Sequence, residues 1–311
     1  MIKDTYGRSF KKLRISLTQV CNIACTYCVP EGKPVNNTTG NLASANDLVK
    51  MVKKIHAVNP LEVVRLTGGE PLLYQDLPYL IESLQKLGIQ VKMTTNALLL
   101  KKKLPELINA GLHSINISLD ALDPNIFFKI TRSLKYKEVL DGIDLALQHL
   151  LDVKLNAVIV RGVNEKQILP LLQFAGEKKI SIRFLELMQM GHLFAGGLTN
   201  LVSEEEILNI IQQQHSIFPL ERTENATSNY WITDNLIKFG IISNHSQPFC
   251  SDCDRLRLDS QGNIYGCISS ELGYSIIHAD EETIREKLRL ALKQKKMAFT
   301  GSSISMKYIG G

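Results

Sequence analysis

Short runs rich in β-branched residues alternate with amphipathic stretches from about residue 12 to residue 188. "KLRISLT" (Lys12–Thr18) alternates as a strand does, whereas "SANDLVKMVKKIHAV" has apolar residues at helical spacing behind Ser44, a predicted N-cap. Further strands are predicted within residues 62–68, 90–96, 114–121, 153–160 and 181–188, with helices between them. This alternation favours a parallel sheet with crossover helices. Six such units fit either an open doubly wound sheet or an incomplete (β/α)6 TIM-like barrel.

The alternation of strands and helices breaks beyond about Ala195. A predicted helix, "SEEEILNIIQQQ", is followed by a strand containing Tyr230 and Trp231 and then by a group of cysteines. A chain of 311 residues is long enough for one large α/β domain with a substantial extension. We therefore expect a partial barrel over residues 1–195 and an α+β extension over residues 196–311.

Composition narrows the class of protein. The chain is 44% hydrophobic and 22% charged, as soluble globular proteins are. It has no apolar run of bilayer-spanning length and no signal-peptide pattern at its N-terminus, so we expect a cytoplasmic protein without membrane attachment. The net charge of +5 is spread along the chain, which does not indicate nucleic-acid binding but suits a small polyanionic substrate if Arg and Lys converge.

Unusual residues follow each predicted strand. In parallel α/β folds, binding groups gather beyond the carboxyl ends of the strands, so we expect these residues to share one rim. In chain order they are a cysteine group, "TGGEP" (Thr67–Pro71), "TTNA" (Thr94–Ala97), "SLDA" (Ser118–Ala121), Lys154 with Asn156, and Arg183 with Glu186 and Met188.

The first cysteine group has the spacing C-x3-C-x2-C, at Cys21, Cys25 and Cys28. In a reducing compartment, metal ligation or chemistry is a better interpretation than disulfides. A structural zinc site needs four ligands, whereas a [4Fe–4S] cluster on three thiolates keeps one iron open for a small molecule. A zinc knuckle and simple burial of the cysteines remain as alternatives.

The second cysteine group is C-x2-C-x13-C, at Cys250, Cys253 and Cys267. It again supplies three thiolates. His245, five residues before Cys250, makes a Cys3His zinc site the alternative to an iron–sulfur cluster.

The first cysteine group followed by "GGEP" after the second strand resembles the radical S-adenosylmethionine (SAM) superfamily. Within it, the chain is similar to the GTP 3′,8-cyclase (MoaA) family almost from end to end. The segments that carry the resemblance are "GRSFKKLRISLTQVCNIACTYCVPEG", "VVRLTGGEPLL", "TTNALLL", "INISLDALDP", "VKLNAVIVRGVNE", "IRFLELMQMG", "PFCSDCDRLRL" with Cys267, and the final "YIGG".

The resemblance implies an incomplete (β/α)6 TIM-like barrel with a C-terminal α+β extension that carries a second Fe–S cluster. It also implies a radical SAM enzyme that converts GTP to (8S)-3′,8-cyclo-7,8-dihydro-GTP, the first step of molybdenum-cofactor biosynthesis. The adenosyl radical would take hydrogen from C3′ of the ribose, and C3′ would then bond to C8 of the guanine. The implied partners are an electron donor and a downstream cyclic pyranopterin monophosphate synthase, whereas the sequence leaves open whether the chain forms a homodimer.

The family's site residues transfer to this sequence position by position. The implied ligands of two [4Fe–4S] clusters are Cys21, Cys25 and Cys28 for the SAM-binding cluster and Cys250, Cys253 and Cys267 for the substrate-binding cluster. The residues implied to contact SAM are Tyr27, Gly69, Ser118 and Met188. Those implied for GTP are Arg14, Arg65, Thr94, Lys154, Arg183, Arg255, Leu256 and Arg257, and Arg255, Arg257, Gly310 and Gly311 are the implied catalytic residues. For single residues, the alternatives are surface ion pairing for an arginine, core filling for Tyr27 and a frayed terminus for the glycines.

Four positions depart from the family pattern. Gln19-Val20 stands in place of an Asp-Arg pair, Val63 in place of a basic residue, Ala97 in place of glycine and Asp254 in place of asparagine. Ala97 is expected to be the mildest change unless its position needs a positive φ. The departures leave a second hypothesis about function open: the chain is a radical SAM enzyme with one auxiliary Fe–S cluster that acts on another nucleotide or a peptide. A non-enzymatic iron–sulfur or zinc protein for electron transfer or scaffolding is a third.

Overall fold

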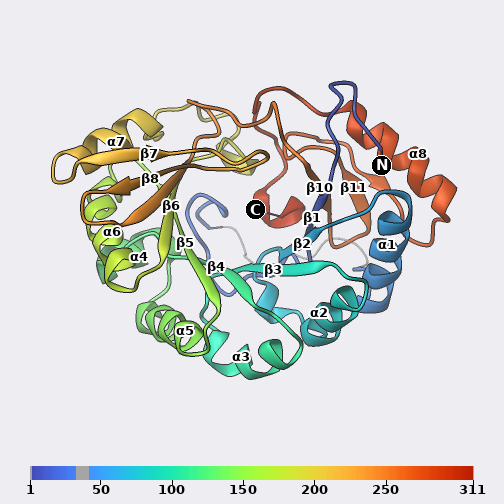
Figure 1. The fold of residues 1–311 in the computed structure, drawn as a ribbon, viewed down its shortest axis with the longest axis horizontal. Helices are drawn as coiled ribbons and strands as arrows, with labels where there is room; N and C mark the ends of the chain where they lie inside the picture. The colour runs from blue at the N-terminus through green and yellow to red at the C-terminus, as the bar shows by residue number, and fades with distance from the viewer. Residues whose placement is uncertain (1, 33–41, 311) are drawn as a thin grey trace.

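A curved row of eight parallel strands forms the centre of the computed structural model, which describes residues 2–32 and 42–310 (Figure 1). The row runs β10-β1-β2-β3-β4-β5-β6-β9, and antiparallel pairs extend it at both edges. The strands are β1 (Lys12–Ser16), β2 (Val63–Thr67), β3 (Gln90–Thr95), β4 (Ser114–Ser118), β5 (Asp152–Ile159), β6 (Ser181–Glu186), β7 (Ile217–Leu220), β8 (Asn229–Thr233), β9 (Lys238–Ile242), β10 (Arg255–Leu258), β11 (Asn263–Tyr265) and β12 (Tyr274–Ser275).

Helices cover the outer face of this sheet (Figure 1). They are α1 (Ala45–Val58), α2 (Leu77–Gln85), α3 (Leu100–Asn109), α4 (Pro124–Thr131), α5 (Tyr136–Gln148), α6 (Ile168–Glu177), α7 (Glu204–Gln212) and α8 (Glu281–Lys293), with the short α9 (Met306–Ile309) near the C-terminus. Strands β1 to β6 stand in chain order, so the predicted incomplete (β/α)6 TIM-like barrel is confirmed. None of the helices in the described ranges is long and apolar enough to cross a bilayer.

Local sequence explains the first crossover helix. The Ser44 hydroxyl accepts a hydrogen bond from the Asp47 N–H at 3.1 Å, and the Asp47 carboxylate reaches back to the Ser44 N–H, which forms a capping box. Leu48, Met51 and Ile55 lie on one face of α1 and are buried in the core. The predicted N-cap at Ser44 is thus confirmed.

The strand alternation sends apolar side chains outward to the helices and polar ones inward. In β5, Val153, Leu155 and Ala157 belong to the hydrophobic core, whereas Lys154 and Asn156 line an interior cavity. Period-two alternation therefore builds the core and the site from the same strand.

The extension differs from expectation in its topology. Its strands β9 and β10 join the parallel sheet beside β6 and β1, so the residues after 195 extend the barrel wall at both ends without closing it. Helix α4 was not predicted; Pro124 opens it behind an Asp123 N-cap. The domain boundary near residue 195 falls in the connection between β6 and α7 and stays a prediction.

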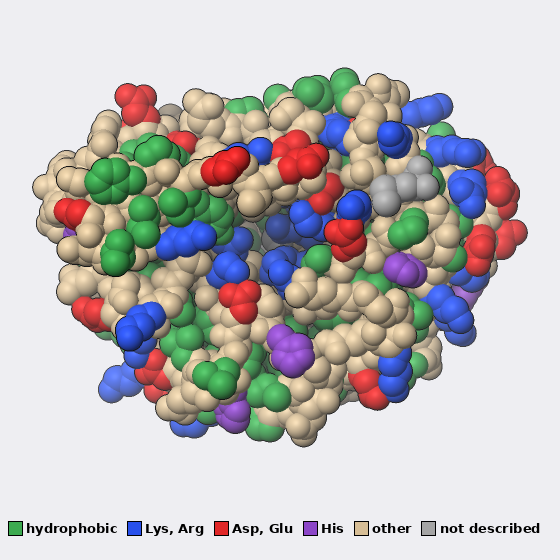
Figure 2. Space-filling model, viewed as in Figure 1, with side chains coloured by type: hydrophobic (Ala, Val, Ile, Leu, Met, Phe, Trp, Pro, Cys, Tyr) green, Lys and Arg blue, Asp and Glu red, His purple; other side chains and the backbone are tan. Residues whose placement is uncertain are grey.

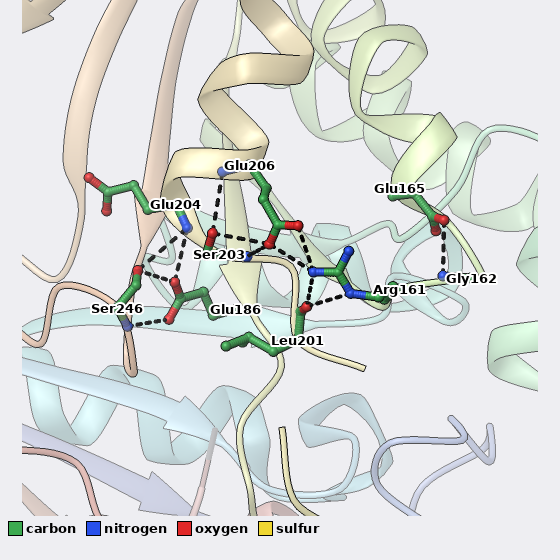
Figure 3. Close-up of polar contacts among 9 residues, drawn as sticks. All are labelled: Arg161, Gly162, Glu165, Glu186, Leu201, Ser203, Glu204, Glu206 and Ser246. Atoms are coloured by element: carbon green, nitrogen blue, oxygen red, sulfur yellow. Dashed lines mark hydrogen bonds and ion pairs between the residues drawn. The ribbon is translucent and has the colours of Figure 1, made fainter. Parts of the chain in front are cut away.

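A buried carboxylate ties β6 to the extension (Figure 3). Glu186, at the end of β6, accepts hydrogen bonds from the backbone N–H groups of His245 at 2.8 Å, Ser246 at 3.1 Å and Glu204 at 3.0 Å. Beside it, Arg161 donates to both carboxylate oxygens of Glu206 and to the carbonyl of Leu201. The hydrogen bonds of Glu186 to His245 and Ser246 hold the segment that leads into the second cysteine group.

Candidate active site

A cavity of about 380 Å³ lies on the inner face of the curved sheet and is lined by strongly basic side chains. Figure 2 shows Lys and Arg side chains gathered in the hollow at the centre of the molecule. The basic residues that line it are Lys12, Arg14, Arg65, Lys92, Lys154, Arg183, Arg255, Arg257 and Lys295. Among the residues that the structure describes, no Asp or Glu lines this cavity. Such an excess of positive charge indicates an anionic ligand.

Four of these cations form a row across four neighbouring strands. Arg257 on β10 is the register partner of Arg14 on β1, Arg14 is the partner of Arg65 on β2, and Arg65 is the partner of Lys92 on β3. Like charges placed directly opposite each other in a sheet are destabilising. The row is therefore better explained by binding an anion than by stability.

Desolvation and mutual repulsion disfavour the charged form of the arginines in this row. Burial and the charges of Arg257 and Arg65 lower the pKa of Arg14 well below its ordinary value, and burial together with Arg183 lowers the pKa of Arg65 to about 9. The Nε and Nη2 of Arg183 and the Nη2 of Arg255 are buried without a hydrogen-bond partner, and these two side chains are 9% and 8% exposed. Unpaired buried donors are costly, so a ligand with several acceptor oxygens fits here.

The second cysteine group lies in the same cavity. Cys250, Cys253 and Cys267 all line it. Lys295 Nζ donates to Cys253 Sγ at 3.2 Å, and Arg255 Nε donates to the same sulfur at 3.4 Å. Although burial acts to raise it, the charges of Arg255 and Lys295 lower the pKa of Cys253 to about 6. This thiol is therefore poised as a thiolate, the form that binds metal.

The first cysteine group lies on a loop held by the turn after β2. The Gly69 N–H donates to the Thr18 carbonyl at 2.6 Å, and the Glu70 N–H donates to the Val20 carbonyl at 2.8 Å. A Cβ at Gly69 would collide with the Val20 carbonyl and lie 3.1 Å from the Cys21 nitrogen. Only glycine allows this close approach, which explains the glycine of "GGEP".

Glu70 connects this turn to the third strand. Its buried carboxylate accepts hydrogen bonds from the Leu72 N–H at 3.0 Å, the Thr95 hydroxyl at 2.6 Å and the Asn96 N–H at 2.8 Å. Asn96 Nδ2 in turn lies 3.8 Å from Cys21 Sγ. Burial raises the pKa of Glu70 to about 7, since these donors offset only part of the desolvation.

The three thiols of the first group influence one another. Burial raises the pKa of Cys25 well above its usual value, and Cys28, Asp120 and Cys21 raise it further. Burial followed by the charge of Cys21 raises the pKa of Cys28 to about 12. Clustered thiols of this kind are protonated without metal, and iron binding would release their protons.

Tyr27 is anchored by a buried carboxylate. Its hydroxyl donates to Asp120 Oδ2 at 2.7 Å, and the other oxygen of Asp120 accepts from the Val158 N–H at 2.8 Å. Tyr27, Ser118 and Cys25 line one small cavity of about 20 Å³, separate from the cavity that the basic side chains line. The aromatic ring between the cysteines is therefore fixed in place.

The C-terminal tail enters the site. Arg257 Nη1 donates to the carbonyl of Gly310 and, at 3.2 Å, to that of Ile309, while the Ser16 hydroxyl donates to the Lys307 carbonyl at 2.9 Å. Gly310 has a φ of +81° and packs against Thr67. The frayed-terminus alternative is wrong for Gly310, whereas Gly311 lies outside the described residues.

The structure brings most of the predicted site residues together. The large cavity is lined by Arg14, Arg65, Thr94, Lys154, Arg183, Arg255, Arg257, Met188, Cys250, Cys253 and Cys267. Tyr27 and Ser118 lie beside Cys25, and Gly69 lies against Cys21. Leu256 points away from the cavity into the hydrophobic core, so any ligand contact would fall to its backbone.

The exception stated for Ala97 applies. Ala97 has a φ of +64°, so its position does need the left-handed conformation that glycine adopts without strain. The alanine methyl is fully buried, and Gly142 packs closely against it. Ala97 is thus a strained substitution, and the condition under which it would be the mildest departure is not met.

Sequence reasoning missed several residues of the site. Lys12 and Lys92 line the cavity two residues before Arg14 and Thr94, and this period-two spacing is the signal that could have found them. Lys295, on the segment after α8, carried no such signal. The predicted alternative ligand His245 packs edge-on against Phe299 with ring centroids 4.9 Å apart. Within residues 2–32 and 42–310, no three His, Cys, Asp or Glu side chains form a ready-made site for a metal ion.

Comparison with known proteins agrees with this geometry. Residues 15–175 match the family model described as "Radical SAM superfamily", and residues 180–300 match "Molybdenum Cofactor Synthesis C". Proteins named GTP 3′,8-cyclase from Staphylococcus aureus strains Mu3 and Newman are each 40% identical over 275 residues, which is 86% of this chain and 81% of theirs.

Solved structures share the fold. Streptococcus suis SuiB bound to its precursor peptide SuiA has a TM-score of 0.68 at 17% identity, covering 92% of this chain and 67% of that one. Methylornithine synthase has a TM-score of 0.52 at 17% identity, covering 66% of this chain and 62% of that one.

The chain is a radical SAM protein, a class whose members use a [4Fe–4S] cluster and SAM. Within that superfamily it belongs to the GTP 3′,8-cyclase family, as the sequence resemblance predicted.

Proposed function

We propose that this chain converts GTP to (8S)-3′,8-cyclo-7,8-dihydro-GTP, as the name of its relatives indicates. The observation that carries the proposal is the arginine row Arg257–Arg14–Arg65, placed in one cavity with Cys250, Cys253 and Cys267. The cavity therefore offers a polyphosphate site and a set of thiolate donors side by side. A guanine nucleotide triphosphate presents phosphates to the first and ring nitrogen and oxygen atoms to the second.

The donor sets fit two clusters. Cys21, Cys25 and Cys28 would hold a [4Fe–4S] cluster with SAM, and Cys250, Cys253 and Cys267 would hold a second one that faces the substrate. Each set offers three thiolates, which leaves one iron open for a ligand. When bound, the first cluster and SAM supply a 5′-deoxyadenosyl radical that can remove hydrogen from an unreactive carbon. Thiolate clusters need a reducing compartment, so we place the protein in the cytoplasm.

The chain's own residues would bind the phosphates of the substrate, orient the substrate and shield it from water. Arg14, Arg65 and Arg183 would pair with phosphate oxygens, because the planar guanidinium matches two oxygens at once. Arg257 would hold the C-terminal tail against the substrate through its contact with the Gly310 carbonyl. Met188, Phe249, Phe299 and Met306 form apolar parts of the wall and limit the access of water.

Hydrogen and electron balance define the product. C3′ loses one hydrogen atom, a C3′–C8 bond forms, and one electron and one proton return to the guanine ring, which leaves N7 protonated. Reductive cleavage of bound SAM, which would yield methionine and 5′-deoxyadenosine, would require one further electron. The product has the same mass as GTP, and two electrons per turnover come from a donor protein or reductant. A cyclic pyranopterin monophosphate synthase would consume the product.

Anaerobically reconstituted protein tests the proposal. About eight irons per chain are expected for two four-iron clusters. With SAM, dithionite and GTP, 5′-deoxyadenosine should form only when GTP is present, together with a compound that has the mass of GTP but a different retention time. About four irons and one zinc, with SAM cleavage indifferent to GTP, would favour another radical SAM reaction on a different nucleotide or a peptide.

A further inference from the structure

Lys92 extends the arginine row to a fourth strand. Its register partner is Arg65, and it lines the same cavity from β3. Among the described residues, Lys92 makes neither a hydrogen bond nor an ion pair within contact distance. Burial and the charges of Arg65 and Lys154 lower its pKa, and the nearby carboxylate of Asp152, which is ion-paired with Lys154, opposes this only in part. This half-buried cation therefore makes no direct hydrogen bond or salt bridge among the described residues, and its amino group is available to a ligand.

Lys12 lies beside Val63, where the family pattern has a basic residue and this chain has none. Lys12 is the register partner of Val63. Lys12 lines the cavity, and its Nζ lies 2.8 Å from Asp254 Oδ2. Asp254 is itself a departure, standing where the pattern has asparagine. The two departures therefore lie around one lysine, which provides a cation one strand away from Val63.

We propose that Lys92 and Lys12 are phosphate-binding residues that replace the cation absent at Val63. This inference rests on the proposed function for the identity of the nucleotide, but its chemistry requires only a polyphosphate. Both lysines flank β2, on β3 and β1, so the phosphates lie across the β1–β3 side of the cavity. Asp254 orients Lys12 and reduces its charge toward the ligand. The added cations favour a triphosphate over shorter phosphate chains.

Binding of GTP, GDP, guanosine and inorganic tripolyphosphate to the anaerobically reconstituted protein tests this inference. Lys92→Met should weaken GTP and tripolyphosphate binding at least tenfold and leave guanosine binding unchanged. Lys12→Met should weaken GTP binding several-fold, whereas Asp254→Asn should maintain or strengthen it. Lys102→Met, at an exposed lysine of α3, is the matched control and should bind all four ligands as the wild type does. In turnover, both cavity variants should raise KM and leave kcat unchanged.

The outcomes separate this inference from the proposed function. Equal loss of GTP and guanosine binding in Lys92→Met, or no loss of tripolyphosphate binding, would overturn the role of Lys92. Weaker GTP binding in Asp254→Asn would overturn the arrangement around Lys12. If tripolyphosphate binding depends on both lysines but GTP is not cyclised, the phosphate site stands and the proposed function fails.

Discussion

Arg14 on β1 and Arg65 on β2 are register partners, so two half-buried guanidinium groups project from neighbouring strands into one cavity. Within the described ranges, no Asp or Glu side chain lines that cavity. Repulsion between these cations destabilises the folded protein, whereas a bound anion would relieve it. The two effects can be measured as changes in the free energy of unfolding with and without the anion.

Arg14→Met should stabilise the protein without ligand. Replacing a desolvated, unpaired charge with an apolar side chain of similar length is expected to raise the free energy of unfolding by roughly 1–3 kcal/mol. Urea unfolding with and without tripolyphosphate measures both effects, because the anion should stabilise the wild type and not the variant. A variant that is less stable than the wild type without ligand would show that Arg14 is structural.

Ala97→Gly should be close to neutral. Relief of the left-handed strain, about 1–2 kcal/mol, offsets the loss of a buried methyl group and the added chain entropy. Ala157→Gly, at an equally buried position of β5 without positive φ, should cost roughly 1.5 kcal/mol or more. Urea unfolding measures the free energy of unfolding of both variants. An equal decrease in Ala97→Gly and Ala157→Gly would contradict the backbone strain at Ala97.

Tyr27→Phe should destabilise the protein by about 1–3 kcal/mol, because it leaves Asp120 Oδ2 buried without its donor. Tyr79→Phe is the matched control, since Tyr79 is 46% exposed and its hydroxyl bonds to Asn46 at the surface. The control should change the free energy of unfolding by less than about 0.5 kcal/mol. Similar losses in both variants would argue against a specific role for the Tyr27–Asp120 hydrogen bond.

Glu70 should make stability fall as the pH rises. Its pKa is raised to about 7 in the folded protein, above the ordinary carboxyl value, so the native state holds a proton that the unfolded chain has already lost. The contribution of Glu70 to the free energy of unfolding therefore decreases as the pH rises from about 4.5 to about 7, and it does not change further above that pH. Over that range, urea unfolding should show the wild type losing roughly 3 kcal/mol more than Glu70→Gln. Parallel pH profiles would contradict this.

Much of the fold and site could be predicted from the sequence, for physical reasons. Period-two strands and capped helices depend on local interactions, and the order of β1 to β6 follows from right-handed crossovers between parallel strands. Cys21, Cys25 and Cys28 are close in sequence, so their grouping was evident. Arg255 and Arg257 shared a strand face by spacing alone.

The rest depends on contacts between distant segments. The pairing of β10 with β1 places Arg257 beside Arg14, although 243 positions separate them in the sequence, and no periodicity encodes that register. Lys295 reaches Cys253 only because α8 packs behind β11. The positive φ of Ala97 was likewise invisible, because alanine does not signal the conformation that the turn imposes.

The most direct test of the central claim uses GTP labelled with deuterium at C3′ of the ribose. Reconstituted protein is incubated anaerobically with SAM and dithionite, and the 5′-deoxyadenosine is analysed by mass spectrometry. If this chain cyclises GTP, 5′-deoxyadenosine gains one deuterium and the cyclised product, with C3′ bonded to C8, has lost it. Release of 5′-deoxyadenosine without deuterium, at a rate that does not depend on GTP, would contradict the proposal.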